Sequence, residues 1–406
     1  MGAAPTGSAA LQRRKQMIFV AIAALLVVAS IELILGVARR VSGRIEVLLY
    51  PDEGMWIPDE LVGRRGNPDY PGHDEWGFRN PVVPETARIV ALGDSLTYGT
   101  MVESEEPWPR QLEQISDIST YNMAFGGFGP THELLLWDEA RRLDPEVVIV
   151  AMYAGNDLYD CFNLTYGGEN LKDLRSTEPA IIDAVKALRG DDMRGNLRDH
   201  GEPYTPLRAW VRKNSSIYGL LRALRDVVFG RYWRDDPEWK QAKSQANYPG
   251  NAAFESAEAK TVFTIARRTV ALNFDDVRIR EGHRIALAAL QRLHQITSEA
   301  GAQMVVLLLP TKEYVFSERV FAEGGEPIEG YSALLGNERA MWAETRRFLA
   351  EHSIPHIDSL TTLRASFSDG KQPFRRDIDG HLNAHGNRQI AELMYSELRE
   401  RGFIDP

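Results

Sequence analysis

The sequence predicts an α/β protein with a doubly wound parallel sheet, a mainly helical insertion and an N-terminal transmembrane helix. Three observations predict this fold class. Short, continuously apolar segments alternate with segments of helical periodicity, which is typical of parallel strands covered by helices on both faces. Residues 160–280 interrupt that alternation, and a long apolar run precedes all of it. At 406 residues, 44% of them hydrophobic, the chain is long enough for two average domains or for one large domain with an insertion.

The apolar run extends from Met17 to Ala38, with basic residues on both sides. Its one charged residue, Glu32, lies toward the C-terminal end, where a carboxylate either reaches the interface or faces a partner. The run is long enough to cross a bilayer. We therefore expect a signal anchor in residues 1–40 that places the bulk of the chain on the extracytoplasmic side, periplasmic or extracellular. The alternative is a cleaved signal peptide with a weak small-residue site at 28–30.

Residues 41–84 form a lead-in rich in proline, glycine and aspartate, for which we expect irregular structure with short edge strands. The main domain is expected over residues 85–406. Its strands are predicted from short apolar segments at 88–92, 120–123, 147–153, 304–309 and 354–358. The segment 147–153 is apolar throughout, as expected of a central strand buried on both faces.

Helical periodicity predicts the elements that cover the sheet. The expected helices are 108–115, 131–143, 281–300, 342–351 and 387–401. Within the insertion at 160–280, the pattern predicts three further helical pieces, at 181–188, 216–228 and 255–272. Parallel strands joined by such helices place their binding sites at the carboxyl ends of the strands.

The charge balance excludes one class of partner. The formal net charge is −10, from 57 acidic and 47 basic residues. This excess repels phosphate backbones, so we expect no nucleic-acid binding. The single cysteine, Cys161, cannot form an intrachain disulfide.

Three loops that follow predicted strands carry polar or glycine residues that could line a site at the edge of the sheet. Ser95 lies just after the strand at 88–92, near a helix start where anionic oxygen is favoured. Gly127 belongs to a glycine cluster that lets backbone N–H groups approach a ligand. Asn156 follows the strand at 147–153 and can donate its side-chain N–H into the same cleft. Taken alone, the loops of Ser95 and Gly127 are better explained as a helix cap and a turn, and the alternative for the Asn156 loop is an Asx-type turn.

A fourth loop, before the last helix, contains Asp379 two residues before His381. A carboxylate at that spacing can fix the orientation and tautomer of an imidazole, which a serine nucleophile needs because a free hydroxyl is weakly nucleophilic at neutral pH. The alternative is a metal site made of Asp379, His381 and His385. No other histidine cluster supports it. We expect no metal and no organic cofactor, and treat His385 as a bystander.

Together, the four loops resemble the sequence blocks of the SGNH (GDSL-type) hydrolase superfamily, whose sheet is of the three-layer, flavodoxin-like kind. The matching residues are Gly93-Asp94-Ser95-Leu96, Gly127 within residues 122–129, Gly155-Asn156-Asp157 and Asp379-Gly380-His381-Leu382-Asn383-Ala384. The apolar anchor, Gly77-Phe78-Arg79-Asn80 in the lead-in and Pro310-Thr311-Lys312-Glu313 are similar to membrane-anchored bacterial members.

The sequence departs from the family pattern in two ways. Many members have an aspartate three residues before the histidine, where this chain has Ile378. Asp379 matches the spacing of the alginate-acetylation-type branch, and Asp377 remains the weaker candidate for the same role. The insertion is also longer than in a minimal family domain, so substrate specificity does not carry over.

The resemblance implies a role for each of these residues. Ser95 is the nucleophile, His381 the base and Asp379 the residue that orients it, while Ser95, Gly127 and Asn156 form the oxyanion hole. The implied function is a serine esterase that removes small acyl groups from envelope or extracellular substrates, carbohydrate-linked esters included. The alternatives are an O-acyltransferase acting on an exported polysaccharide and a catalytically silent binding protein on the same scaffold. The oligomeric state, the acyl group and the acceptor do not follow from the sequence.

Overall fold

The computed structural model describes residues 7–42, 45, 48–50, 54–188, 210–211, 214–229, 236–323, 329–368 and 370–405. The chain divides into two compact units. The anchor unit consists of Met1–Trp56 and Pro203–Tyr232, and the main unit of Ile57–Glu202 and Trp233–Pro406. Part of the predicted insertion therefore belongs to the same unit as the N-terminal helix.

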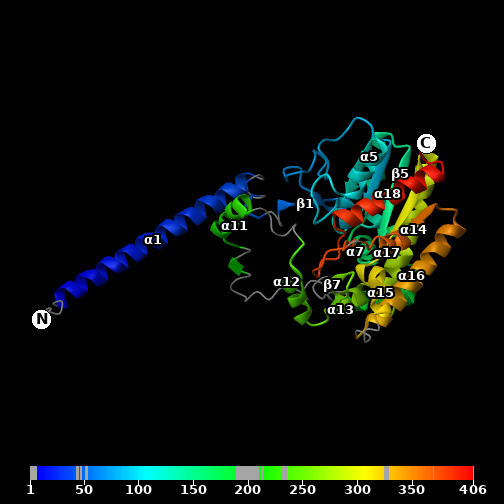
Figure 1. Ribbon diagram of the computed structural model, residues 1–406. Coiled ribbons are helices and arrows are strands. Elements are labelled where there is room, and N and C mark those ends of the chain that lie inside the picture. The colour runs from blue at the N-terminus through cyan, green and yellow to red at the C-terminus, as the bar shows by residue number, and fades with distance from the viewer. Residues whose placement is uncertain are drawn as a thin grey trace. The chain divides into compact units, whose positions relative to one another are not determined.

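The core of the main unit is a five-stranded sheet in the order β4-β3-β5-β8-β9, with every neighbouring pair parallel (Figure 1). The strands are β3 (Ile89–Gly93), β4 (Thr120–Ala124), β5 (Val147–Tyr153), β8 (Gln303–Leu309) and β9 (His356–Asp358). Every residue of β5 is buried. The doubly wound parallel sheet predicted from the sequence is confirmed, because the apolar runs form strands that are covered on both faces.

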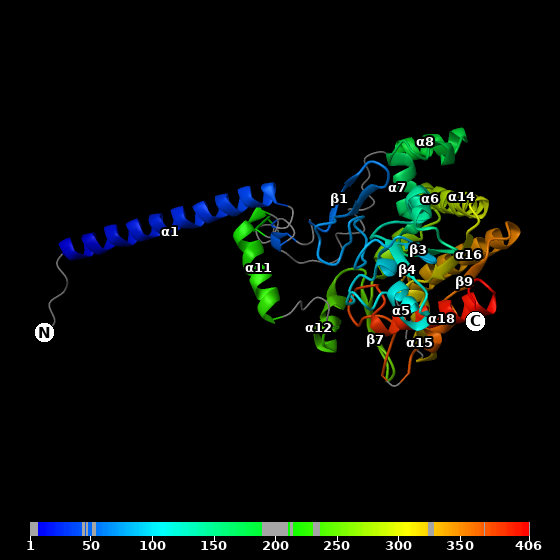
Figure 2. The same cartoon turned by 90° about the horizontal axis from the view of Figure 1, so that it is seen from above.

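Two layers of helices cover this sheet (Figure 2). The described helices of this part of the fold are α4 (Ser95–Tyr98), α5 (Trp108–Ser116), α6 (Pro130–Ala140), α7 (Asp157–Gly167), α14 (Val277–Glu299), α15 (Lys312–Ala322), α16 (Tyr331–Glu351), α17 (Leu360–Ala365) and α18 (Ala384–Glu400), with 3₁₀ turns at Arg141–Leu143, Lys172–Leu174 and Gln245–Asn247. On one face α5 packs against α18 and β4, and on the other α6 and α7 pack against α14.

The insertion differs from its predicted pattern at one place. The helix expected at 255–272 is wrong over its first half, which forms an antiparallel hairpin of β6 (Ala252–Glu255) and β7 (Lys260–Phe263). Only the second half is helical, as α13 (Ile265–Ala271). β7 carries Thr261, Val262 and Phe263, residue types that favour strands, and the Val262 N–H donates to the Arg376 carbonyl 3.0 Å away. The other helices in the described part of the insertion are α8 (Pro179–Ala187), α11 (Ser216–Phe229) and α12 (Trp239–Ser244).

The lead-in forms its own two-stranded sheet, β1 (Trp56–Asp59) and β2 (Gly63–Gly66), which does not join the central sheet as edge strands. Its later residues are bonded to the segments that carry the site. The Asn80 side chain exchanges two hydrogen bonds of 3.0 Å with the backbone of Asn122 in β4. The lead-in therefore braces the sheet edge next to the predicted nucleophile.

His73 of the lead-in gives a prediction of stability against pH. Its ring contacts the Asn67 carbonyl and the Tyr98 hydroxyl at 2.8 Å each, and burial lowers its pKa to about 4. Since the folded pKa lies below the unfolded value, its contribution is present above about pH 6.5 and is lost as the pH falls toward 4. We expect wild type to lose about 3 kcal/mol more unfolding free energy than His73→Gln between pH 7.5 and 4. Urea unfolding at both pH values measures it, and equal losses would contradict it.

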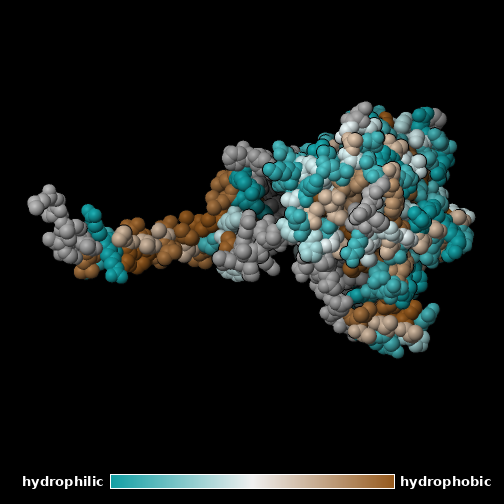
Figure 3. Space-filling model, turned by 60° about the horizontal axis from the view of Figure 1, so that its bottom comes forward, coloured by the Kyte–Doolittle hydropathy of each residue, from teal (hydrophilic) through white to brown (hydrophobic). Residues whose placement is uncertain are grey.

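The anchor unit is built on α1 (Gly7–Val41). It is long and apolar enough to cross a membrane over Leu11–Val41, and it lies where a signal sequence would also lie. Its apolar surface is drawn brown in Figure 3. α11 packs against α1 within the same unit.

Candidate active site

Ser95 is the first residue of the short helix α4, directly beyond the carboxyl end of β3. The turn is fixed by Asp94, whose side chain caps α4 by accepting the Leu96 N–H at 2.9 Å. This places the Ser95 hydroxyl at the edge of the sheet, half-buried rather than enclosed. A nucleophile at that edge remains within reach of a substrate.

The structure brings Ser95 together with the two other residues that the sequence singled out. The Ser95 Oγ lies 2.8 Å from His381 Nε2, and His381 Nδ1 lies 2.8 Å from Asp379 Oδ1. The same Asp379 oxygen also accepts the backbone N–H of His381 at 2.8 Å. Residues 286 positions apart in the chain thus form one continuous hydrogen-bonded series.

The electrostatics of this series fix its protons. Burial raises the pKa of Asp379, but the charge and hydrogen bonds of His381, with a contribution from Arg375, outweigh it and hold this pKa well below its usual range. An ionised Asp379 only accepts, so His381 Nδ1 carries the proton and Nε2 is left to accept from the serine hydroxyl. The imidazole is 25% exposed, which leaves it accessible to a substrate leaving group.

Asp377, the second candidate for the orienting acid, lies elsewhere. Its carboxylate pairs with Arg375 at 3.0 Å and accepts the Asp379 N–H at 3.1 Å. It thus supports the loop on which Asp379 sits, and Asp379 is the carboxylate that contacts the imidazole.

The two other expected donors lie beyond the neighbouring strands β4 and β5. Gly127 has φ +80°, a left-handed conformation, and a Cβ there would lie 2.5 Å from Arg64 Nη2. Arg64 itself donates to the Gly126 carbonyl at 2.9 Å, so the lead-in holds this turn. Asn156 precedes α7, and its Nδ2 donates to Asp160 Oδ2 at 2.8 Å, which fixes the orientation of the amide.

Buried carboxyl groups lie behind the nucleophile. Burial raises the pKa of Asp94 to about 6, and it raises the pKa values of Glu133 and Asp157 well above their ordinary range. Burial therefore favours the neutral forms of Glu133 and Asp157 and so lessens the negative charge behind Ser95.

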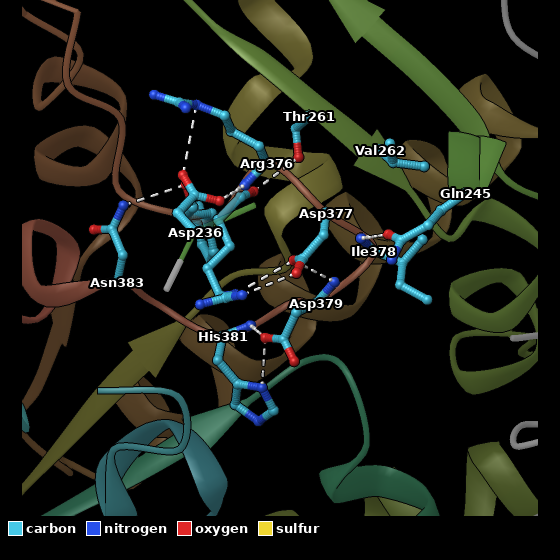
Figure 4. Close-up of polar contacts among 12 residues, drawn as sticks. Asp236, Gln245, Thr261, Val262, Arg376, Asp377, Ile378, Asp379, His381 and Asn383 are labelled. Carbon is cyan, nitrogen blue, oxygen red and sulfur yellow. Dashed lines mark hydrogen bonds and ion pairs between the residues drawn. The ribbon is translucent and has the colours of Figure 1, made fainter. Parts of the chain in front are cut away.

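The insertion braces the loop that carries the histidine. Figure 4 shows this loop between the insertion residues Gln245, Thr261 and Val262 on one side and the His381 ring on the other. Gln245 Oε1 accepts the Ile378 N–H at 2.9 Å, and the Thr261 hydroxyl donates to the Arg375 carbonyl at 3.1 Å. The insertion thus positions the base from behind.

Lys312, the first residue of α15, also supports the loop that carries His381. Its ammonium group is fully buried and donates three hydrogen bonds, to the carbonyls of Val262 (2.9 Å), Asp377 (2.7 Å) and Asp379 (2.9 Å). Burial lowers its pKa, but three donors on three carbonyls use the whole hydrogen-bonding capacity of the charged form. Lys312 therefore ties the Asp379 backbone to β7.

We expect Lys312→Met to lower kcat by about 10- to 100-fold with little change in KM. A less firmly held His381 slows proton transfer in the chemical step, whereas substrate binding does not depend on it. The substitution should also lower the unfolding free energy by about 3 kcal/mol, since three buried carbonyls lose their donor. Steady-state kinetics and thermal unfolding measure both, with exposed Lys240→Met as the matched control. Unchanged kcat in a folded Lys312→Met variant would contradict the positioning role.

Sequence reasoning missed two residues that shape the site. Lys312 follows the end of the apolar β8 by three residues and lies in the segment 310–313 that resembles family members, but the sequence alone assigns it no role. Arg268 had no signal in the sequence: it is buried on α13, donates to the Gly155 carbonyl at 3.2 Å, and lies so close to Gly380 that a Cβ there would approach its Nη2 to 2.2 Å. It therefore packs between the loops of Asn156 and His381.

His385 does not take part in the site. Its Nε2 contacts the Ser366 carbonyl at 2.8 Å, away from the Ser95 contact made by His381. Among the described residues, no group of three histidine, cysteine or acidic side chains is placed to hold a metal ion.

Comparison with known proteins gives structural neighbours only. No protein-family model matches the sequence. A search of curated proteins also finds no match. Phospholipase A1 from Streptomyces albidoflavus is 12% identical and aligns over 77% of this chain and 99% of its own, with a TM-score of 0.36. A GDSL-like lipase from Bacteroides thetaiotaomicron is 8% identical over 79% of this chain and 93% of its own, with a TM-score of 0.33.

Proposed function

We propose that this chain is a serine esterase of the SGNH type that removes small acyl groups from esters on envelope or extracellular substrates, including carbohydrate-linked esters. The observation that supports it most is the hydrogen-bonded series from Asp379 through His381 to Ser95, at 2.8 Å for each step. This is the arrangement that turns a serine hydroxyl into a nucleophile. α1 holds the chain at the membrane, with the main unit on the extracytoplasmic side.

The reaction proceeds in two steps. The Ser95 oxygen attacks the ester carbonyl while His381 Nε2 takes its proton, and Asp379 stabilises the resulting imidazolium. The tetrahedral intermediate collapses as His381 gives the proton to the leaving alcohol, and an acyl-serine remains. Water then attacks the acyl group with His381 again as base, which releases the acid and restores Ser95. The N–H groups of Ser95 and Gly127 and the Asn156 amide stabilise both oxyanions.

Exposure of the site favours water as the acyl acceptor. Ser95 is half-buried and His381 is 25% exposed, so the acyl-serine is open to solvent. Release of acetate from a small aryl acetate, measured with and without an oligosaccharide acceptor, tests the proposal. We expect equal acetate release in both. Acyl appearing on the sugar would contradict hydrolysis, and no turnover by the folded chain would contradict an esterase altogether.

We expect Asn156→Ala to lower kcat by about 10²- to 10³-fold, because one oxyanion donor is lost. The fold should survive, since the side chain bonds only locally, to Asp160 and Asp157. Kinetics on an aryl acetate with a thermal unfolding control measure this. Wild-type turnover in the variant would remove Asn156 from the mechanism.

A further inference from the structure

Glu32, the charged residue in the apolar run of α1, has hydrogen-bond partners on another helix. Its carboxylate accepts the Ser215 hydroxyl at 3.0 Å, the Ile217 N–H at 3.1 Å and the Ser216 N–H in a shorter contact. These donors form the start of α11, and both helices belong to the anchor unit (Figures 1 and 2). Glu32 thus caps α11 from a neighbouring helix.

The contact reduces two free-energy penalties that arise for polar groups in an apolar medium. A carboxylate within a membrane span is expensive unless it is paired or hydrogen-bonded. The first N–H groups of a helix lack partners within that helix, and they carry partial positive charge. Glu32 and the start of α11 satisfy each other. The pairing is therefore well suited to a place where water does not supply partners.

The position of Glu32 sets the depth of this contact. It lies six residues before Ala38, or about 9 Å inside the end of the apolar run at the helical rise. Further along α11, Gly219 packs against the backbone of Leu49. A Cβ atom on Gly219 would lie 2.3 Å from the Leu49 carbonyl oxygen. A bilayer that takes up α1 therefore also meets the start of α11.

The outer face of α11 carries exposed leucines beside the exposed Arg225. Ser216 is buried at its contact with α1, whereas Leu221 and Leu224, one turn apart, are 61% and 53% exposed. Trp210, which precedes the helix, is 61% exposed. These exposed apolar side chains belong to the same unit as α1, and no described residue covers the most apolar stretch of α1. An apolar face on a helix that also carries arginines is typical of helices at the lipid–water interface.

We propose that α11 is a second membrane contact, with Leu221, Leu224 and Trp210 in the acyl chains beside the end of α1 and with its N-terminus capped by Glu32. The proposal rests on membrane anchoring by α1, which is part of the proposed function. Lipid is the expected partner of this face because Glu32, which holds the start of α11, lies within the apolar run of α1. A second copy of this chain is the competing occupant.

The test places an environment-sensitive fluorophore on Leu221→Cys or Leu224→Cys of the full chain, in a Cys161→Ala background, reconstituted into phosphatidylcholine–phosphatidylglycerol vesicles. We expect blue-shifted emission and severalfold stronger quenching by lipids spin-labelled in the shallow acyl chain than for a label on exposed Glu400→Cys. Quenching by aqueous iodide instead would overturn the lipid contact. Energy transfer between labels on different copies, without lipid quenching, would assign the face to a second copy and also overturn it.

The cap is tested by Glu32→Ala, with Ser30→Ala on the same helix as the matched control. We expect Glu32→Ala to abolish most lipid quenching at Leu221→Cys, and Ser30→Ala to leave it unchanged. Hydrolysis of a soluble aryl ester should be unaffected by either. Chain that floats with vesicles but carries water-exposed labels overturns this inference alone. If the protein does not float with the vesicles, membrane anchoring by α1 is contradicted as well. If the wild-type protein does not hydrolyse the aryl ester, only the proposed esterase activity is contradicted.

Discussion

Replacement of Ser95 by alanine is expected to lower kcat for an aryl acetate by about 10⁶-fold, to the level at which only the remaining oxyanion donors and binding act. The alanine variant cannot form an acyl-serine, and His381 has no hydroxyl to deprotonate. Because Ser95 is half-buried and its Oγ bonds to His381 and, at 3.3 Å, to Asp94, the fold should be retained. Kinetics and thermal unfolding measure the two effects separately.

The matched control is Ser396→Ala, on the exposed side of α18, where the hydroxyl only contacts the Leu393 carbonyl of its own helix. We expect wild-type turnover from that variant. Turnover by Ser95→Ala within about tenfold of wild type would show that the serine is not the nucleophile.

Asp379→Asn is expected to lower kcat by about 10⁴-fold with the overall geometry intact. The amide can present its N–H₂ group to His381 Nδ1, which turns the imidazole to the wrong tautomer and leaves Nε2 protonated. The negative charge that stabilises the imidazolium is also lost. Measurement of kcat against pH on the variant and wild type gives the effect.

Asp377→Asn is the contrast that separates the two candidate acids. Its carboxylate pairs with Arg375 and receives the Asp379 N–H, so its loss should reduce stability and lower kcat by no more than about tenfold. A larger kcat loss for Asp377→Asn than for Asp379→Asn would reverse the assignment.

Much of the sheet could be predicted because its strands are apolar on both faces. The run at 147–153 coincides with β5, and the loops after β3, β4 and β5 hold Ser95, Gly127 and Asn156 as their sequence positions implied. In a parallel sheet the carboxyl ends lie at one edge, so sequence order and topology suffice to gather those loops. The family resemblance implied that His381 acts on Ser95, and the structure places His381 Nε2 2.8 Å from the Ser95 Oγ.

The supports of the site could not be predicted, because they depend on contacts between distant segments. The sequence of β7 predicts a helix, but its Val262 N–H bonds to the distant Arg376 carbonyl and the segment forms a strand. Arg268 contacts two loops that are far apart in the sequence. The sequence predicts that Glu32 reaches the interface or faces a partner. In the structure its carboxylate accepts hydrogen bonds at the start of α11, more than 180 residues away in the sequence. Tertiary pairing of this kind overrides local propensity.

The most direct measurement is covalent labelling with a fluorophosphonate, in which the serine oxygen displaces fluoride from phosphorus only if it is activated. We predict one adduct, mapped by peptide mass spectrometry to Ser95, absent from Ser95→Ala and much slower to form in Asp379→Asn. A folded wild-type chain that gains no adduct, or gains it at another residue, would contradict an activated serine at this site.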